Sequence, residues 1–468
     1  MVFNTPIFFV FFIVFLLIYG LILVQKTPRL YFILVASLVF YGAWNYKFIP
    51  LLVGSSIVDY YLALAIAGAA TIQRKKLLLT LSIVMNLGIL GLFKYADFLL
   101  VSAADFLTLF GVEASLPTLS WVLPVGISFY TFQSLSYTID VYRGDMQPRK
   151  GLVHFTTALA FFPQLVAGPI LRARQILPQF HSLPIPTWEN ARHGFLLFTS
   201  GIVKKTFADL MAGPASVLFE AEGPVSLLET WTGVLAFAGQ IYGDFAGYTD
   251  MAIGAALIIG FKIPRNFNLP YFAVSPVDFW RRWHISLSSW LRDYLYISLG
   301  GRNSRLRNVM ITMLLGGLWH GAAWTFVAWG FFHGIIITAT HWLGQLKVFA
   351  SFVASNSKWL TVLKWAITFY LVLIGWVLFR AHSIDSALAI IGNMHTFSGL
   401  PEAGSVAIRV TAITVAGVIY MHLQDWFVIA KGEVFEQKKW VFWPVLILLQ
   451  AICLLIGAPS SEFIYFQF

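Results

Sequence analysis

The sequence predicts an all-α polytopic membrane protein, because it is very apolar, poor in charge and built from long uninterrupted apolar runs. Of its 468 residues, 59% are hydrophobic and only 11% are charged, with a mean hydropathy of +0.77. Soluble domains average roughly 25% charged residues. Residues 7–24 form a continuous apolar run, whereas the strands of a membrane barrel alternate polar and apolar residues. Such a run is close to the roughly 20 residues that a helix needs to cross a bilayer.

The basic residues predict an orientation for the first third of the chain. Residues 7–24 are expected to be a retained first helix, since no basic segment precedes them and no small-residue cleavage site follows. Basic residues follow the first, third and fifth expected helices, and this asymmetry predicts cytoplasmic odd-numbered loops with the N-terminus outside. The residues concerned are Lys26, Arg29, Arg74, Lys75, Lys76, Arg143, Arg149 and Lys150.

The net charge of +10 is therefore expected to reflect these loops, and no nucleic-acid partner is predicted. The single cysteine, Cys453, lies in a late apolar run and excludes an intrachain disulfide and a cysteine metal site. No zinc spacing, P-loop or serine-hydrolase elbow is present. No metal is expected, and an enzyme with these residues would rely on a histidine and an activated substrate.

The middle of the chain departs from simple spanning helices. Residues 155–170 are apolar but short, contain two prolines and have basic residues on both sides, so they predict a re-entrant or interfacial element. Lys204 and Lys205 interrupt the next apolar run in a similar way. Residues 276–296 predict one amphipathic interfacial helix, with Ser275 as its N-cap and Pro276 in the first turn. Its apolar stripe comprises Trp280, Trp283, Leu287, Trp290, Leu291 and Tyr294.

These features predict a single integral membrane domain over residues 1–468. Residues 1–120 are expected to hold the N-terminal helices, residues 121–345 a core with broken and horizontal helices, and residues 346–468 the C-terminal helices. No internal repeat and no separate soluble domain is visible.

Two histidines are candidate functional residues. His320 lies 13 residues after Arg307, roughly 20 Å along a helix, and an ionisable side chain at such depth favours a general base or proton relay. A structural histidine bonded to a neighbouring helix is the alternative. His284 follows a basic aromatic segment, where position alone favours an interfacial structural role over a functional one. His333 and His341 are expected to be structural.

Two charged groups allow more than one interpretation. Asp244 and Asp250 suggest a path or a partner for a base, or a tight turn at the interface. A basic group could hold the phosphates of a nucleotide-like cofactor or contact anionic lipid. It comprises Arg281, Arg282, Arg292, Arg302, Arg305 and Arg307.

With these residues the chain resembles the membrane-bound O-acyltransferase superfamily, in particular the bacterial alginate O-acetyltransferase branch. That branch includes membrane subunits that acetylate cellulose and peptidoglycan. The matching stretches are residues 123–130, 140–144, 162–169, 244–251, 279–296 and 316–321. The resemblance implies about 11 transmembrane helices, with re-entrant and interfacial helices, around a central tunnel. It places the family's catalytic histidine on His320 and its second motif histidine on His284.

The resemblance further implies an acetyl-CoA-dependent enzyme of the bacterial inner membrane that passes acetyl groups outward for O-acetylation of an exopolysaccharide, as in biofilm polymers. A separate periplasmic acetyltransferase subunit, the polysaccharide acceptor and membrane lipid are the expected partners. Acetyl-CoA is expected to bind near Arg281, Arg282, Trp283 and Arg302. Asp244, Asp250 and Trp319 are expected along the tunnel, and bulky Trp319 and Trp324 to limit the acyl chain to acetyl. The alternatives are a peptidoglycan-acetylating subunit, a polysaccharide or lipid transporter and a membrane scaffold.

Overall fold

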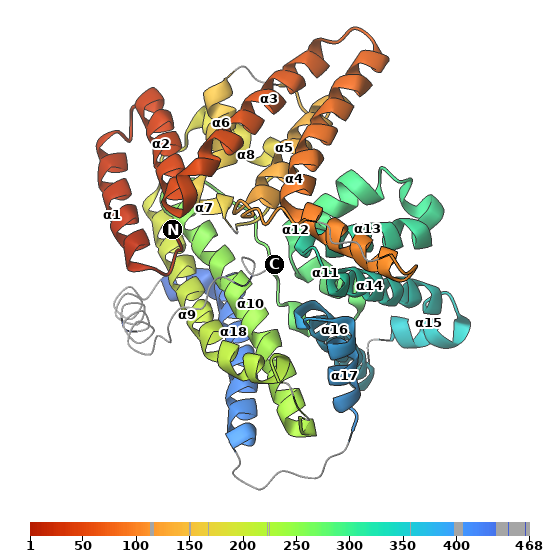
Figure 1. Cartoon of the computed structure of the whole chain (residues 1–468). Coiled ribbons are helices and arrows are strands. Elements are labelled where there is room, and N and C mark those ends of the chain that lie inside the picture. Colours follow the sequence, from red (N-terminus) through yellow and green to blue (C-terminus); the bar gives the residue numbers. More distant parts are fainter. Residues whose placement is uncertain are drawn as a thin grey trace. The chain divides into compact units, whose positions relative to one another are not determined.

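The computed structural model describes residues 1–112, 117–148, 151–166, 168–221, 223, 225–355, 357–396, 406–436, 448 and 464. These residues form helices and connecting segments without a strand, which confirms the predicted all-α class (Figure 1). Arg149, Lys150, Ala167 and Cys453 lie outside the described residues. The helices are α1 Pro6–Leu21, α2 Lys26–Asn45, η1 Tyr46–Phe48, α3 Ile49–Gly68, α4 Ile72–Thr108, α5 Ile127–Arg143, α6 Leu152–Ala160, α7 Phe162–Leu165, α8 Ala173–Ser182, α9 Trp188–Phe219, α10 Leu227–Ile258, η2 Pro270–Phe272, α11 Pro276–Arg282, α12 Ile285–Trp290, η3 Leu291–Tyr296, η4 Gly301–Ser304, α13 Arg305–His320, α14 Trp324–Leu343, α15 Lys347–Ala354, α16 Lys358–Arg380, α17 Ile384–Asn393 and α18 Val406–Glu436.

Several helical stretches are long and apolar enough to cross a bilayer. Within the described residues there are five, with the shorter apolar helix α1 in addition. The first combines α2, η1 and α3, and the others are α4, α14, α16 and the part of α18 up to Trp426. The chain is therefore a multi-pass membrane protein, while the number of about 11 crossings stays a prediction.

The chain divides into two compact units that interleave along the sequence. The first comprises residues 1–195 and 252–264, and the second residues 196–251 and 265–468. Division at residues 120 and 345 stays a prediction. In the first unit, buried Asp59 on α3 accepts hydrogen bonds from Ser82 and Asn86 on α4 and from Ser134 on α5. Neutral donors thus compensate a carboxyl group where water is excluded.

The segment predicted to be re-entrant forms two short helices in the first unit. Helix α6 has 9 residues and α7 has 4, so at ~1.5 Å per residue neither approaches the length of a span. Phe155 and Leu165 are both at most 4% exposed. This agrees with an element whose irregular backbone lies within protein.

A tight helical hairpin organises the second unit. Helices α13 and α14 lie side by side (Figure 1), and their backbones approach so closely that glycine is required. A Cβ on Gly317 would lie 2.2 Å from the carbonyl oxygen of Phe326, and one on Gly330 would lie 2.4 Å from that of Met313. The hairpin turns immediately after His320, where α13 ends and Gly321 is extended. Glycines therefore fix where the long apolar run folds back.

The prediction of one continuous helix over residues 276–296 is wrong. Its start is as expected, since Ser275 Oγ accepts a hydrogen bond from the backbone N–H of Asp278 at 3.1 Å. The helix then ends at Arg282, and α12 begins after His284, whose φ is +43°. The backbone on each side of this break bonds to the loop of residues 266–268. Asn268 N–H donates to the Arg282 carbonyl and Ile285 N–H donates to the Asn266 carbonyl, each at 2.9 Å. Tertiary hydrogen bonds replace those that a continuous helix would make.

Candidate active site

His320 is the last residue of α13, in the second unit, and only 4% of its surface is exposed. Aromatic rings surround the imidazole edge-on: the ring centroids of Trp319, Trp329 and Phe379 lie 5.0, 5.1 and 5.2 Å from its own. A dry aromatic environment strengthens any charge interaction that develops at the imidazole. The position at a helix end, beside the hairpin turn, combines a fixed backbone with access from one side.

His284 lies beside His320 although another segment carries it. The two ring centroids are 6.4 Å apart with an interplanar angle of 61°. Phe245 and Trp319 flank the His284 ring at 4.7 and 5.7 Å, and the residue is fully buried. Burial lowers the pKa of His284 to about 3, so the imidazole is neutral at physiological pH. The structure thus brings together both histidines that the sequence singled out.

Asn266 contacts His284 directly. Its side-chain Oδ1 lies 3.2 Å from His284 Nδ1 and accepts hydrogen bonds from the backbone N–H and the hydroxyl of Ser286, at 3.0 and 2.8 Å. Asn266 is 1% exposed. The other ring nitrogen of His284, Nε2, is buried and has no hydrogen-bond partner among the described residues.

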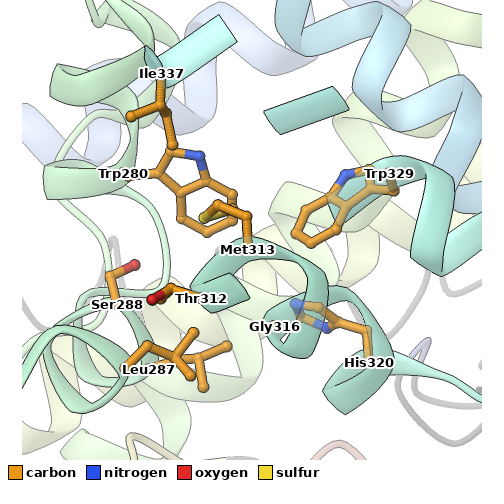
Figure 2. A pocket seen from close by; sticks show the side chains of 10 residues that line it. Trp280, Leu287, Ser288, Thr312, Met313, Gly316, His320, Trp329 and Ile337 are labelled. Atoms are coloured by element: carbon orange, nitrogen blue, oxygen red, sulfur yellow. The ribbon is translucent and has the colours of Figure 1, made fainter. Parts of the chain in front are cut away.

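A small chamber opens on His320. It encloses about 100 Å³, and Figure 2 shows His320 and Trp329 on one side with Trp280 on the other. Its walls are almost entirely apolar, with the hydroxyls of Ser288 and Thr312 as the polar exceptions. The lining residues are Trp280, Leu287, Ser288, Leu291, Thr312, Met313, Gly316, His320, Trp329 and Ile337.

A larger basic cavity adjoins this chamber. It encloses about 450 Å³ and shares five lining residues with the chamber, namely Trp280, Ser288, Thr312, Met313 and Ile337. Four arginines line it: Arg281, Arg292, Arg302 and Arg305. The two cavities form a wide basic entrance that narrows to an apolar end at His320, the shape expected for a long anionic molecule with a reactive tip.

The arginines of this entrance differ in how they are neutralised. Arg292 pairs with Asp293 at 2.6 Å. Arg281, Arg302 and Arg305 make no ion pair or hydrogen bond with the part of the chain that the structure describes. Three uncompensated guanidinium groups around one cavity attract an anion, and phosphate suits their geometry.

Two residues predicted to bind the donor do not line either cavity. Arg282 donates from Nε to Asp278 at 2.9 Å. Trp283 is 1% exposed and packs in an aromatic cluster, 5.0 Å from Phe267 and 4.7 Å from Trp376 between ring centroids. The break at His284 turns this part of the predicted stripe into the protein core. Trp319 contacts both histidines, whereas Trp324 is 59% exposed.

Asp244 and Asp250 also lie outside both cavities, in a buried network of charges. Lys205 pairs with Asp244 at 2.9 Å and with Asp209 at 2.7 Å. Lys204 pairs with Asp250 at 2.5 Å and with Asp425 of α18, which also accepts from the Tyr242 hydroxyl. These pairs let α9 continue through two lysines that are each 1% exposed. The two lysines that interrupt the apolar run of the sequence thus lie within one continuous helix.

His333 and His341 have the surroundings of supporting residues. His333 is 1% exposed. Its Nδ1 accepts a hydrogen bond from the indole N–H of Trp280 at 3.3 Å, and this bond holds the Trp280 ring against the chamber. His341 lies at the basic entrance. Sequence reasoning missed the wall residues Trp280, Trp329 and Met313 and the contact of Asn266. For Asn266, the available signal was the turn-forming sequence Asn266-Phe267-Asn268, which follows an apolar run.

Comparison with known proteins identifies the family of the chain. Residues 149–381 match the model of the membrane-bound O-acyltransferase family. The chain is 42% identical to the probable alginate O-acetylase AlgI of Azotobacter vinelandii, covering 90% of this chain and 84% of the relative. The chain belongs to the membrane-bound O-acyltransferase family. Its relatives include the probable AlgI of Pseudomonas putida, 39% identical over 100% of both chains, and the peptidoglycan O-acetyltransferase of Helicobacter pylori, 37% identical over 86% of this chain and 81% of the relative.

Membership of the membrane-bound O-acyltransferase family makes the chain a membrane acyltransferase, which uses an acyl donor and an acceptor. The resemblance stated from the motifs is thereby confirmed.

Proposed function

We propose that this chain takes acetyl groups from acetyl-CoA at the inner membrane and passes them outward for O-acetylation of an extracytoplasmic polysaccharide of the alginate type. The observation that carries the proposal is the basic entrance that narrows to His320 beside His284. Two alginate O-acetylases among the relatives support the acetyl group and the polymer class.

The entrance fits the two ends of a coenzyme A thioester. The phosphates would bind near Arg281, Arg302 and Arg305, whose guanidinium groups are otherwise uncompensated. The thioester would enter the apolar chamber, where Trp280 and Trp329 exclude water. Excluding water matters because hydrolysis of the thioester competes with transfer. An entrance of this charge suits the cytoplasmic face, where basic residues concentrate.

Acetyl transfer then requires removal of one proton. His320 would accept the proton of an acceptor hydroxyl, the oxygen would attack the thioester carbonyl, and the carbon–sulfur bond would break. The proton returns to the departing sulfur, which leaves as the free thiol of coenzyme A. A two-step route, in which His320 first carries the acetyl group, uses the same atoms. Trapping of an acetylated His320 in the absence of acceptor separates the routes.

The small chamber supports acetyl as the transferred group. About 100 Å³ bounded by two tryptophans leaves little space beyond a two-carbon acyl group. In this geometry Trp280 and Trp329, rather than Trp324, set the limit.

We further propose that a separate periplasmic acetyltransferase receives the acetyl group and completes its transfer to the polymer. The peptidoglycan O-acetyltransferase relative favours peptidoglycan as the second candidate acceptor. Oligosaccharides of alginate and fragments of peptidoglycan, supplied side by side, distinguish the two.

The deciding experiment follows labelled acetyl-CoA with purified, detergent-solubilised protein, with and without the proposed partner. We expect thioester cleavage or label transfer by the wild type and its loss in His320→Ala. Transfer that persists at the wild-type rate in folded His320→Ala contradicts the role of His320. Movement of a polysaccharide across vesicles without thioester cleavage would instead favour a transporter.

A further inference from the structure

The hydrogen bonds around Asn266 determine which nitrogen of His284 carries the proton. Asn266 Oδ1 accepts from the backbone N–H of Ser286 at 3.0 Å. A backbone N–H can only donate, so the atom facing it must be the amide oxygen and not the amide nitrogen. This assigns the orientation of the Asn266 amide from its neighbours.

The same oxygen faces His284 Nδ1 at 3.2 Å. An amide oxygen has no proton to give, so Nδ1 must be the donor and must carry the hydrogen. In a neutral imidazole the second nitrogen is then bare. His284 is neutral at physiological pH because it is fully buried. Nε2 is therefore a lone-pair acceptor within the protein interior.

We infer that Asn266 is a positioning residue that fixes the Nδ1–H tautomer of His284, so that the bare Nε2 accepts a hydrogen bond from a hydroxyl donor during acyl transfer. Two observations besides the tautomer support the inference. Nε2 is buried without a hydrogen-bond partner among the described residues, and a buried acceptor that stays unsatisfied destabilises the folded protein. The ring also lies 6.4 Å from that of His320 between centroids, and His320 lines the apolar chamber.

The backbone of Asn266 contributes to the same arrangement. Its carbonyl accepts from the N–H of Ile285 at 2.9 Å, which holds the helix break where His284 has φ +43°. Left-handed backbone is strained in a non-glycine residue and persists where its surroundings impose it. One loop residue thus fixes both the backbone and the ring of His284. The hydroxyl-accepting role rests on the proposed function, whereas the tautomer is independent of it.

The experiment compares Asn266→Asp with Asn266→Leu in the full chain. Leucine has a similar size and no acceptor, whereas aspartate retains an acceptor for Nδ1–H. Histidine-selective ¹⁵N labelling distinguishes a bare from a protonated ring nitrogen, and loss of a signal in His284→Gln assigns His284. We expect a bare Nε2 in the wild type and in Asn266→Asp, and a mixed or reversed tautomer in Asn266→Leu.

Activity provides the second measurement. We expect kcat to fall on the order of 10- to 100-fold in Asn266→Leu with KM for acetyl-CoA little changed, and Asn266→Asp to recover most of the loss. A carboxylate beside Nδ1 raises the pKa of His284. The acidic limb of the kcat profile should therefore move to higher pH in Asn266→Asp. The ring contacts and hydrogen bonds of His284 involve Phe245, Trp319, His320, Asn266 and Ser286, of which only His320 also titrates.

A matched control is Asn86→Leu, which removes another buried amide, in the first unit. It should lower thermal stability and leave the His284 tautomer and the pH profile unchanged. A wild-type tautomer in folded Asn266→Leu would overturn the inference even if acetyl transfer is observed. Unchanged kcat in Asn266→Leu with an altered tautomer would overturn the hydroxyl-accepting role. An inactive wild type whose tautomer still depends on Asn266 would instead contradict the proposed function.

Discussion

The imidazole rings of His284 and His320 lie 6.4 Å apart between centroids, although 36 residues separate them along the chain. One ring stands at a helix break and the other at a helix end. Both positions fix the backbone while leaving a ring at the edge of regular structure.

Replacing His320 by alanine should abolish most acyl transfer. Loss of a general base lowers the rate about 10²- to 10⁴-fold, so we expect kcat to fall by that order with the protein still folded. The measurement is label release from acetyl-CoA, with a melting curve for each variant. His382→Ala, at an exposed position, is the control and should retain wild-type activity.

Replacing Arg302 by glutamine should raise KM for acetyl-CoA and leave kcat nearly unchanged. A hydrogen bond to a charged group contributes about 1.5–3 kcal/mol, which corresponds to roughly a 10- to 150-fold rise. Arg307→Gln is the matched control, because Arg307 donates to Asn308 and to the Leu299 carbonyl and does not line the entrance. Equal KM values in the two variants would argue against phosphate binding at this entrance.

Replacing Trp329 by phenylalanine should widen the range of acyl groups. The smaller ring enlarges the chamber of about 100 Å³. One methylene is worth about 1–3 kcal/mol of discrimination in an apolar pocket. We expect kcat/KM for propionyl-CoA relative to acetyl-CoA to rise about 10-fold, measured by competition. Trp324→Phe is the control, because Trp324 is exposed, and it should leave this ratio unchanged. A rise of the ratio in Trp324→Phe and not in Trp329→Phe would mean that the acyl group lies outside the chamber.

Replacing Gly317 by alanine should destabilise the hairpin and inactivate the enzyme together. The new Cβ would lie 2.2 Å from the Phe326 carbonyl oxygen, and such overpacking costs about 1–3 kcal/mol. The added methyl would separate α13 from α14 and displace His320. Gly88→Ala, where a Cβ meets nothing within 4 Å, should keep both stability and activity. Thermal unfolding in detergent provides the comparison.

The sequence predicts those features of the site that depend on neighbouring residues. The succession of Ser275, Pro276 and Asp278 predicts the N-cap that the structure contains. This signal acts within one helical turn.

Features that depend on distant residues were not predictable in this way. The break at His284 exists because residues 266–268 bond to the backbone on its two sides. The sequence of residues 276–296 contains no signal for these bonds. Periodicity placed Trp280 and Trp283 on one stripe, but the break sends Trp283 into the aromatic core and leaves Trp280 at the chamber. The sequence alone does not distinguish Arg282 from Arg281, whereas in the structure Asp278 pairs with Arg282.

The charge network around Lys204 has a consequence for how the protein is made. Asp425, which completes the neutralisation of Lys204, lies 221 residues later. At about 5–20 residues per second, a ribosome needs roughly 10–45 s to reach it. During that interval Asp250 on α10 is the earlier partner of Lys204. The neutralisation of this buried lysine on α9 is therefore completed only after the last described helix of the chain has been made.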